Sequence, residues 1–134
     1  MEGWLKLHRA IVDSAVFEDA EVLKIWIWLL CNVAHEEHDT IYYGKIIHLK
    51  KGQIVSGRKK IAQLTNMSES KVYRALNLLK KMGNIDIKVN NRFSLITVVK
   101  WAFFQADNKK VNSKTTAKRQ QDNSRTTQQK NVKN

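Results

Sequence analysis

The strongest constraint on the fold is a change of apolar periodicity between residues 56 and 99. Apolar residues first recur at i, i+3, i+4 and i+7, the spacing of one buried helix face: Val72, Ala75, Leu76 and Leu79. Beyond Gly83, residues 85–89 alternate between apolar and polar, as a half-buried strand does. The segment therefore predicts a short helix, a tight turn, a longer helix and a β-hairpin, the order of a helix-turn-helix followed by a wing.

Polar residues and glycine mark the ends of the two predicted helices. Ser56 and Ser68 are good N-cap residues, and Gly83 stands where a left-handed C-cap residue belongs. With these caps the third helical positions are Lys59 and Lys71, where a capping box would have Glu or Gln. A cation there is slightly unfavourable unless an anion such as a phosphate binds at the helix N-terminus. The two lysines favour binding to a polyanion, although solvated lysines would give the same pattern.

The outer face of the longer helix carries side chains that can recognise DNA. Arg pairs with guanine, Asn with adenine, and Ser with bases or phosphates. Since the first turns of a recognition helix lie deepest in the major groove, the predicted base contacts are Ser70, Lys71, Arg74 and Asn77. Contacts with the DNA backbone are predicted from a second set on both helices: Arg58, Lys59, Lys60, Tyr73, Lys80 and Lys81.

The hairpin supplies a third group of candidate contacts. Asn90 and Asn91 form the predicted turn, because Asn tolerates a positive φ better than any residue except Gly. Residues 92–99 return as the second strand. The predicted wing contacts with the minor groove or flanking phosphates are Lys88, Asn90, Asn91 and Arg92. An ordinary polar hairpin turn is the alternative interpretation.

The N-terminal third predicts two helices. Trp4, Leu7 and Ile11 share one face of a first helix within residues 4–13, and Asp19 caps a second helix over residues 20–34. The second helix is apolar on two sides, so it is either enclosed by the core or docked on a partner. The candidates for self-association are Ile25, Trp28 and Leu29.

Two further segments complete a predicted domain of residues 1–105. Residues 40–56 are rich in β-branched residues, with Gly44 and Gly52 as turn signals, and predict a small hairpin or a strand that pairs with the wing. After the wing, three aromatic residues are expected to hold the chain end against the core: Trp101, Phe103 and Phe104.

Charge is distributed unevenly along the chain. Residues 1–42 carry a net charge of −5, residues 43–105 a net +11 and residues 106–134 a net +6, within a total of +12. A chain so polarised presents a basic surface to a polyanion. Residues 106–134 contain almost no large apolar side chain, so we predict a disordered basic tail that serves as a linker, a nonspecific DNA arm or both.

Several other classes of protein are not expected. The sequence has no signal peptide, no apolar run long enough to cross a membrane, and a single cysteine, which fits a cytoplasmic protein. Cys31, His35 and His38 have only loose metal-ligand spacing, so we expect neither a zinc site nor any cofactor. No phosphate-binding loop, dinucleotide-binding glycine pattern or nucleophile–base constellation is visible in the sequence, so we do not expect an enzyme.

Segments spread over residues 3–105 resemble one known family. GWLKLHRAIVDSAVFED, LKIWIWLLCNVAH, the stretch from Gly52 to Gly83 and SLITVVKWAFFQ look like the N-terminal winged-helix domain of DnaD-like replication proteins. This family includes replisome organisers of phages and mobile elements in low-GC Gram-positive bacteria. The most specific parts of the resemblance are GWLKLHR and residues 52–83. Longer members carry a second helical domain after a polar linker, which residues 106–134 resemble.

The resemblance implies a role in starting DNA replication. Such proteins bind an origin, self-associate as dimers or larger oligomers, and recruit the replicative helicase or its loader. We therefore predict an α+β winged helix-turn-helix domain with a disordered basic tail, acting as a replication initiation module on double-stranded DNA. Two other functions remain open, because a fold does not fix function. They are a winged-helix transcriptional regulator, and an oligomerisation or protein-interaction domain of a replication protein with weak DNA binding.

Overall fold

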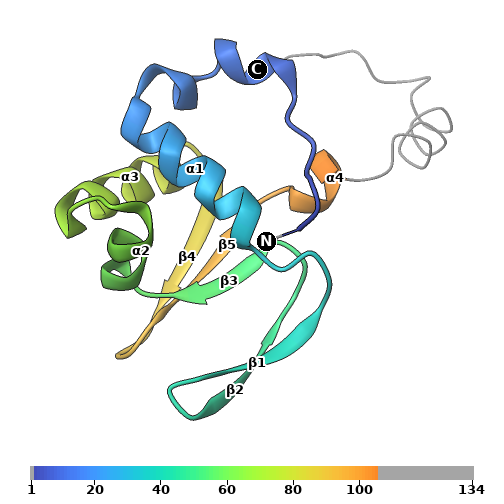
Figure 1. The fold of residues 1–134 in the computed structure, drawn as a ribbon, viewed down its shortest axis with the longest axis vertical. Coiled ribbons are helices and arrows are strands. Elements are labelled where there is room, and N and C mark those ends of the chain that lie inside the picture. Colours follow the sequence, from blue (N-terminus) through green and yellow to red (C-terminus); the bar gives the residue numbers. More distant parts are fainter. Residues whose placement is uncertain (1, 106–134) are drawn as a thin grey trace, which may run out of the picture. The chain divides into compact units, whose positions relative to one another are not determined.

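Helices and two small antiparallel sheets make up residues 2–105, the part of the chain that this computed structural model describes (Figure 1). The helices are α1 (Ala20–Asn32), α2 (Arg58–Thr65), α3 (Glu69–Lys81) and α4 (Trp101–Gln105). The strands are β1 (His38–Tyr42), β2 (Lys45–Leu49), β3 (Gln53–Ser56), β4 (Ile85–Val89) and β5 (Ser94–Val98). Two 3₁₀ segments, η1 (Arg9–Asp13) and η2 (Ala15–Glu18), precede α1. The predicted α+β class is confirmed, and the predicted tail of residues 106–134 lies outside the described residues.

The main core lies between a three-stranded sheet and helices α1, α2 and α3 (Figure 1). The sheet has the strand order β3-β5-β4, so β5 is central, and Ile96 of β5 lies opposite a residue of each neighbouring strand. The largest fully buried side chains of this core come from the sheet and from all three helices: Ile25, Leu29, Ile61, Leu79 and Ile96. Residues 40–56 supply both a hairpin, β1–β2, and the strand β3, which pairs with β5.

Local sequence signals place α3 as predicted. The Ser68 hydroxyl accepts a hydrogen bond from the backbone N–H of Lys71 at 3.2 Å, and Gly83 follows the helix with a left-handed φ of 82°. The four apolar residues at helical spacing are all buried: Val72, Ala75, Leu76 and Leu79. Between α2 and α3 the chain turns at Asn66, whose φ of 57° is also left-handed. Asn is one of the few residues apart from Gly that adopts this conformation readily.

The predicted cap of α2 is wrong. Ser56 is the last residue of β3, where it pairs with Ser94 and is buried, so it does not cap the helix. Gly57 is the N-cap residue, and glycine has no side chain that could accept a hydrogen bond from the helix. The third helical position is therefore Lys60 rather than Lys59.

The predictions for the N-terminal third are partly confirmed. The Asp19 carboxylate accepts hydrogen bonds from the backbone N–H groups of Glu21 and Val22, at 3.0 and 3.1 Å, and so caps α1 as expected. The predicted first helix is reduced to the 3₁₀ segment η1, and Trp4 and Leu7 lie outside it, 84% and 54% exposed. The residue before η1 makes no capping hydrogen bond through its side chain. The helical spacing of three apolar residues was therefore not enough to stabilise an α-helix here.

The two apolar faces of α1 pack mainly against other parts of the same chain. Ile25 and Leu29 are fully buried in the main core, which leaves them no surface for a second copy, so their assignment to self-association is wrong. Trp28 packs against the same core and is partly buried. At the other end of the domain, Trp101 is buried in the core as predicted, whereas Phe103 is 64% exposed. The side chain of Phe104 lies outside the described part of the structure.

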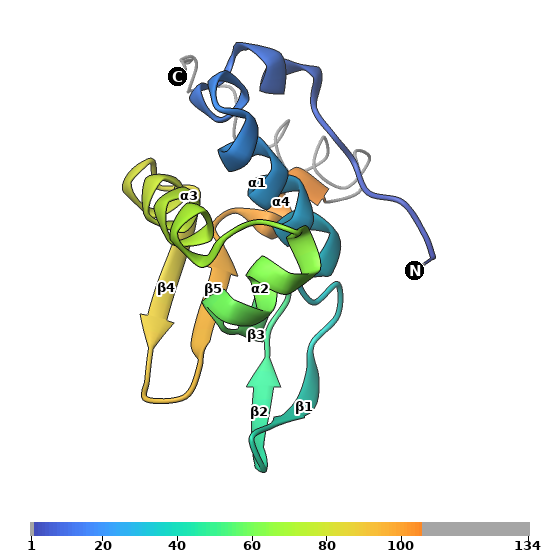
Figure 2. The ribbon, with the colours of Figure 1, turned by 60° about the vertical axis from the view of Figure 1, so that its left-hand side comes forward.

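A second, smaller core packs the β1–β2 hairpin against β5. Its residues come from the segment after α1, both hairpins and β3: Ala34, Leu49 and Val55, with Tyr42, Ile47, Phe93 and Leu95 packed against them. Because of this packing, the β1–β2 and β4–β5 hairpins project from the same end of the domain (Figures 1 and 2).

The β4–β5 turn forms by a different means from the one predicted. Neither Asn90 nor Asn91 has a positive φ. Instead the Asn90 side-chain carbonyl accepts hydrogen bonds from the backbone N–H groups of Arg92 and Phe93, at 2.8 and 2.9 Å. This is an Asx-type turn, and it delays the start of β5 to Ser94.

Gly52 provides a test of the packing around Trp101. Its φ of +85° is left-handed, and a Cβ at this position would lie 2.6 Å from the Cβ of Trp101. We expect Gly52→Ala to lower the free energy of unfolding by about 2–6 kcal/mol, because backbone strain and overpacking each cost about 1–3 kcal/mol. Gly44→Ala is the matched control, since Gly44 has a φ of +74° but open space around it. Urea denaturation measures both; an equal drop in the two variants would contradict the clash with Trp101.

Candidate nucleic-acid interface

A groove of about 1040 Å³ lies where α2, α3 and the turns of both hairpins meet. Its walls are the first turn of α2, the outer face of α3, the end of β1 and the β4–β5 turn. The charged residues that line it are five cations and one carboxylate: Arg58, Lys59, Lys60, Lys80, Arg92 and Glu69. The cations come from three separate elements, so the fold concentrates positive charge that is dispersed along the sequence. Such a surface favours a polyanion.

The first turn of α2 adds backbone donors to this groove. The first N–H groups of a helix have no partner within the helix. Here Gly57 provides no side-chain acceptor for them, and the first turn contains Arg58, Lys59 and Lys60 but no acidic residue. An uncapped helix N-terminus with three cations favours an anionic group such as a phosphate.

Two pairs of an arginine and an aromatic ring lie along the groove. The Arg58 guanidinium lies 4.9 Å from the ring centroid of Tyr73, and that of Arg92 lies 5.9 Å from the ring of Tyr43. These distances are those of cation–π contacts. Arg58 is also 3.9 Å from the Glu69 carboxylate, but both side chains are about half exposed, so this ion pair holds it weakly.

Two of the predicted base contacts are engaged elsewhere. The Arg74 guanidinium lies 2.7 Å from the Asp19 carboxylate and 3.3 Å from that of Glu21, and the Lys71 ammonium lies 3.1 Å from Glu21. The acidic N-terminus of α1 therefore neutralises this edge of α3, and neither cation lines the groove. A base contact by either side chain therefore requires that it give up its ion pair with α1, and base reading by Lys71 and Arg74 stays a prediction. No local pattern could reveal these ion pairs, because Asp19 and Arg74 are 55 residues apart.

The remaining predicted contacts fall into two sets. Half-buried Asn77 and the exposed predicted backbone contacts Tyr73 and Lys80 line the groove from α3, and Asn90 and Asn91 line it from the β4–β5 turn. The other three are exposed but do not line the groove: Ser70, Lys81 and Lys88. Ser70 lies in the first turn of α3, with its hydroxyl oxygen 3.4 Å from that of Ser68.

The aromatic wall on the β1–β2 side of the groove was not predicted. Tyr42 packs edge-on against Tyr43 and Phe93, with ring centroids 4.9 and 5.5 Å apart. Burial raises the pKa of the Tyr42 phenol above its ordinary value, and the neighbouring Tyr43 phenol raises it further. The signal that could have found this wall is the pair of tyrosines directly before Gly44, at a predicted hairpin turn.

Within residues 2–105, no three His, Cys, Asp or Glu side chains lie close enough together to hold a metal ion. No helix in the same range is long and apolar enough to span a membrane.

The chain matches none of the protein-family models, curated proteins or solved structures with which it was compared.

The ion pairs between α1 and α3 generate a testable prediction. Combining Asp19→Asn with Glu21→Gln should release Arg74 and Lys71, and Asn at position 19 keeps the capping oxygen. Because two cations are released and each exposed pair is worth roughly 0.2–1 kcal/mol, we expect affinity for duplex DNA to rise by about 2- to 30-fold at low salt. Fluorescence anisotropy with a labelled duplex measures it.

The matched control is the double variant Asp13→Asn and Glu36→Gln, which changes the net charge equally at two exposed positions that do not pair with Arg74. An equal gain in the control and the test variant would show that net charge alone acts, and that the ion pairs do not restrain α3.

Proposed function

We propose that this chain is a winged helix-turn-helix module that binds double-stranded DNA. In this proposal α2 and α3 are the helix-turn-helix and the β4–β5 hairpin is the wing. The element order α1-β3-α2-α3-β4-β5, with the β1–β2 hairpin between α1 and β3, and the strand order β3-β5-β4 support it. The observation that carries the proposal is the groove, in which five cations from α2, α3 and the β4–β5 turn converge beside the outer face of α3.

The proposed contacts follow from the positions of these groups. Phosphates bind the uncapped first turn of α2 and Lys80, and Arg92 at the β4–β5 turn reaches the flanking backbone or the minor groove. Asn77 is the base-reading candidate inside the groove. Arg74 and Lys71 contribute only when DNA phosphates or bases replace their partners on α1, so their net contribution to affinity is reduced.

We further propose that the DNA-binding role is replication initiation. The support is the resemblance of GWLKLHR and residues 52–83 to DnaD-like replication proteins, since the first of these segments lies outside the groove. This role implies three partners: an origin, further copies of the chain, and the replicative helicase or its loader. It does not include catalysis.

A second candidate function is protein interaction with weak DNA binding. One observation favours it: the segment before α1 exposes several large apolar side chains, namely Trp4, Leu7, Val12 and Phe17. Clustered exposed apolar residues are typical of interaction surfaces. The groove favours the first candidate, because an interaction domain has no need of an uncapped helix N-terminus beside five cations.

Removing two groove cations tests the DNA-binding proposal. We expect the double variant Lys59→Gln and Lys80→Gln to weaken binding to all duplexes at physiological salt. The slope of log affinity against log salt should also become shallower, by about 0.9 for each phosphate that the variant no longer neutralises. Affinities measured over a range of salt concentrations give both quantities.

The control for this experiment is the double variant Lys24→Gln and Lys50→Gln, which removes the same charge from two exposed lysines that do not line the groove. If both double variants reduce the salt slope equally, the groove has no special part in binding, and the proposed DNA contacts are wrong.

The biological role is tested by recovering DNA with the protein. Sheared genomic and mobile-element DNA is captured by the full chain at physiological salt and sequenced. Enrichment of one repeat-bearing region beside an AT-rich segment is the result that we expect from an origin binder. Enrichment at a promoter would instead identify a transcriptional regulator, and uniform recovery would favour the protein-interaction candidate.

A further inference from the structure

Tyr43 occupies a backbone position that rarely carries an aromatic residue. It lies in the two-residue turn between β1 and β2, where Tyr43 and Gly44 both have a positive φ, 52° and 74°. Turns of this kind favour Asn followed by Gly, because a side chain larger than Asn is strained at a left-handed φ. Non-glycine residues in such positions cluster at functional sites. The Tyr43 side chain is also 61% exposed and belongs to neither core, so burial does not explain the strain.

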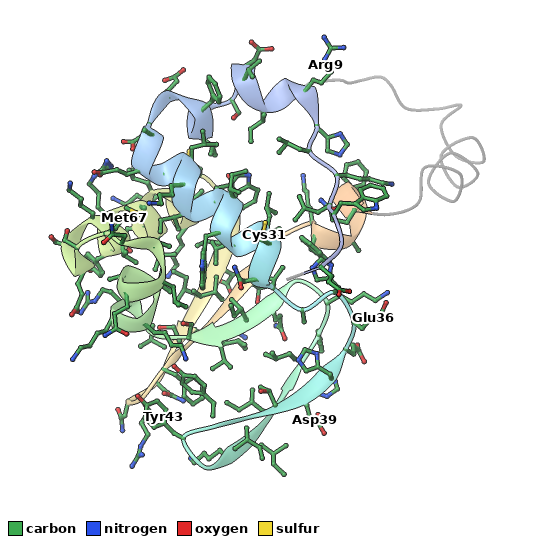
Figure 3. All side chains as sticks on the ribbon, in the orientation of Figure 1. Arg9, Cys31, Glu36, Asp39, Tyr43 and Met67 are labelled. Carbon is green, nitrogen blue, oxygen red and sulfur yellow. The ribbon has the colours of Figure 1, made fainter. Side chains whose placement is uncertain are left out.

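The position of Tyr43 gives this side chain a candidate role. Figure 3 shows Tyr43 at the β1–β2 turn beside the β4–β5 turn, and its ring is within cation–π distance of Arg92 on that second turn. Tyr73, on α3, lines the same groove, is 53% exposed and carries Arg58 over its ring. The groove thus presents two exposed tyrosines from different elements, each beside an arginine.

Exposed aromatic rings gain little from a DNA duplex, because the faces of paired bases are already stacked on one another. Unpaired bases have open faces, and they stack on aromatic side chains while cations bind the backbone between them. A groove that combines exposed tyrosines with five cations therefore has the chemistry of a site for a single strand. Stacking is sequence-tolerant, so this site need not read bases.

We propose that the groove between the two hairpins binds a single-stranded segment of DNA, whose bases stack on Tyr43 and Tyr73. The phosphates lie against Arg58, Arg92 and Lys80, which line the same groove. This inference rests on the proposed nucleic-acid-binding function and extends it: the same cations of the groove bind the phosphates of a duplex or of a single strand, and the tyrosines add affinity only where bases are unpaired.

The test measures binding of the full chain to two fluorescent probes, an oligothymidine and a mixed-sequence duplex of equal length. Tyr43→Asn is the main variant, because Asn removes the ring and suits the left-handed φ, so thermal stability should be kept or raised. We expect it to weaken oligothymidine binding by about 5- to 30-fold and duplex binding by less than twofold. Tyr43→Phe, which keeps the ring, should bind both probes as the unmodified protein does.

A second variant, Tyr73→Leu, should weaken oligothymidine binding in the same way, since Leu suits an exposed helix position but offers no aromatic face. Oligothymidine binding that is absent, or unchanged in both Tyr43→Asn and Tyr73→Leu, would overturn the single-strand site. If the duplex still binds in that case, the proposed duplex function stands. Tyrosine-dependent oligothymidine binding without duplex binding would support the single-strand site and overturn the duplex proposal.

Discussion

The two cores of the domain depend on the central strand β5, which contributes residues to both. Along this strand the even-numbered Ile96 and Val98 belong to the main core with the helices, whereas the odd-numbered Leu95, with Phe93 just before the strand, belongs to the smaller core with the β1–β2 hairpin. Successive side chains of a strand point to opposite faces. One strand therefore joins the main core, which contains the helices, to the smaller core, which contains the β1–β2 hairpin. A shift of register by one residue would exchange the two sets.

Electrostatics divides the surface of α3 into two edges with different properties. On one edge, Asp19 and Glu21 of α1 neutralise Arg74 and Lys71; on the other, Lys80 faces a groove in which five cations outnumber the Glu69 carboxylate. The acidic N-terminal third and the basic middle of the sequence are thus in direct contact. The overall charge of the chain consequently overstates the positive charge that α3 presents. Any polyanion that engages Arg74 must compete with α1, so both salt and the acidic residues of α1 weaken that contact.

Much of the fold could be predicted from the sequence because its signals are local. The prediction of helix α3 needed only the apolar spacing, the Ser68 cap and Gly83, which all lie within one segment. The failures have different physical causes. The segment of residues 4–13 had apolar spacing but too few other interactions to stabilise a short helix. The β4–β5 turn is stabilised by the Asn90 side chain rather than by a residue with a positive φ.

The site was less predictable than the fold, because its contacts join segments that are far apart in the sequence. The contact of Arg74 with Asp19 depends on how the helices pack, and the approach of Tyr43 to Arg92 depends on how the hairpins pack. The sequence shows which residues of α3 are cations. It does not show which of these cations are neutralised by carboxylates of another helix.

The most direct test of the groove as the nucleic-acid interface is an NMR titration. The ¹⁵N-labelled full chain is titrated with a DNA duplex, and the shift of each backbone amide is measured. We predict that the largest shifts lie at residues 57–60, at Tyr73, Asn77 and Lys80 of α3, and at residues 90–93, all of which line the groove. Shifts confined to residues 4–17, where several exposed apolar side chains lie, would contradict this and show that the groove is not the nucleic-acid interface.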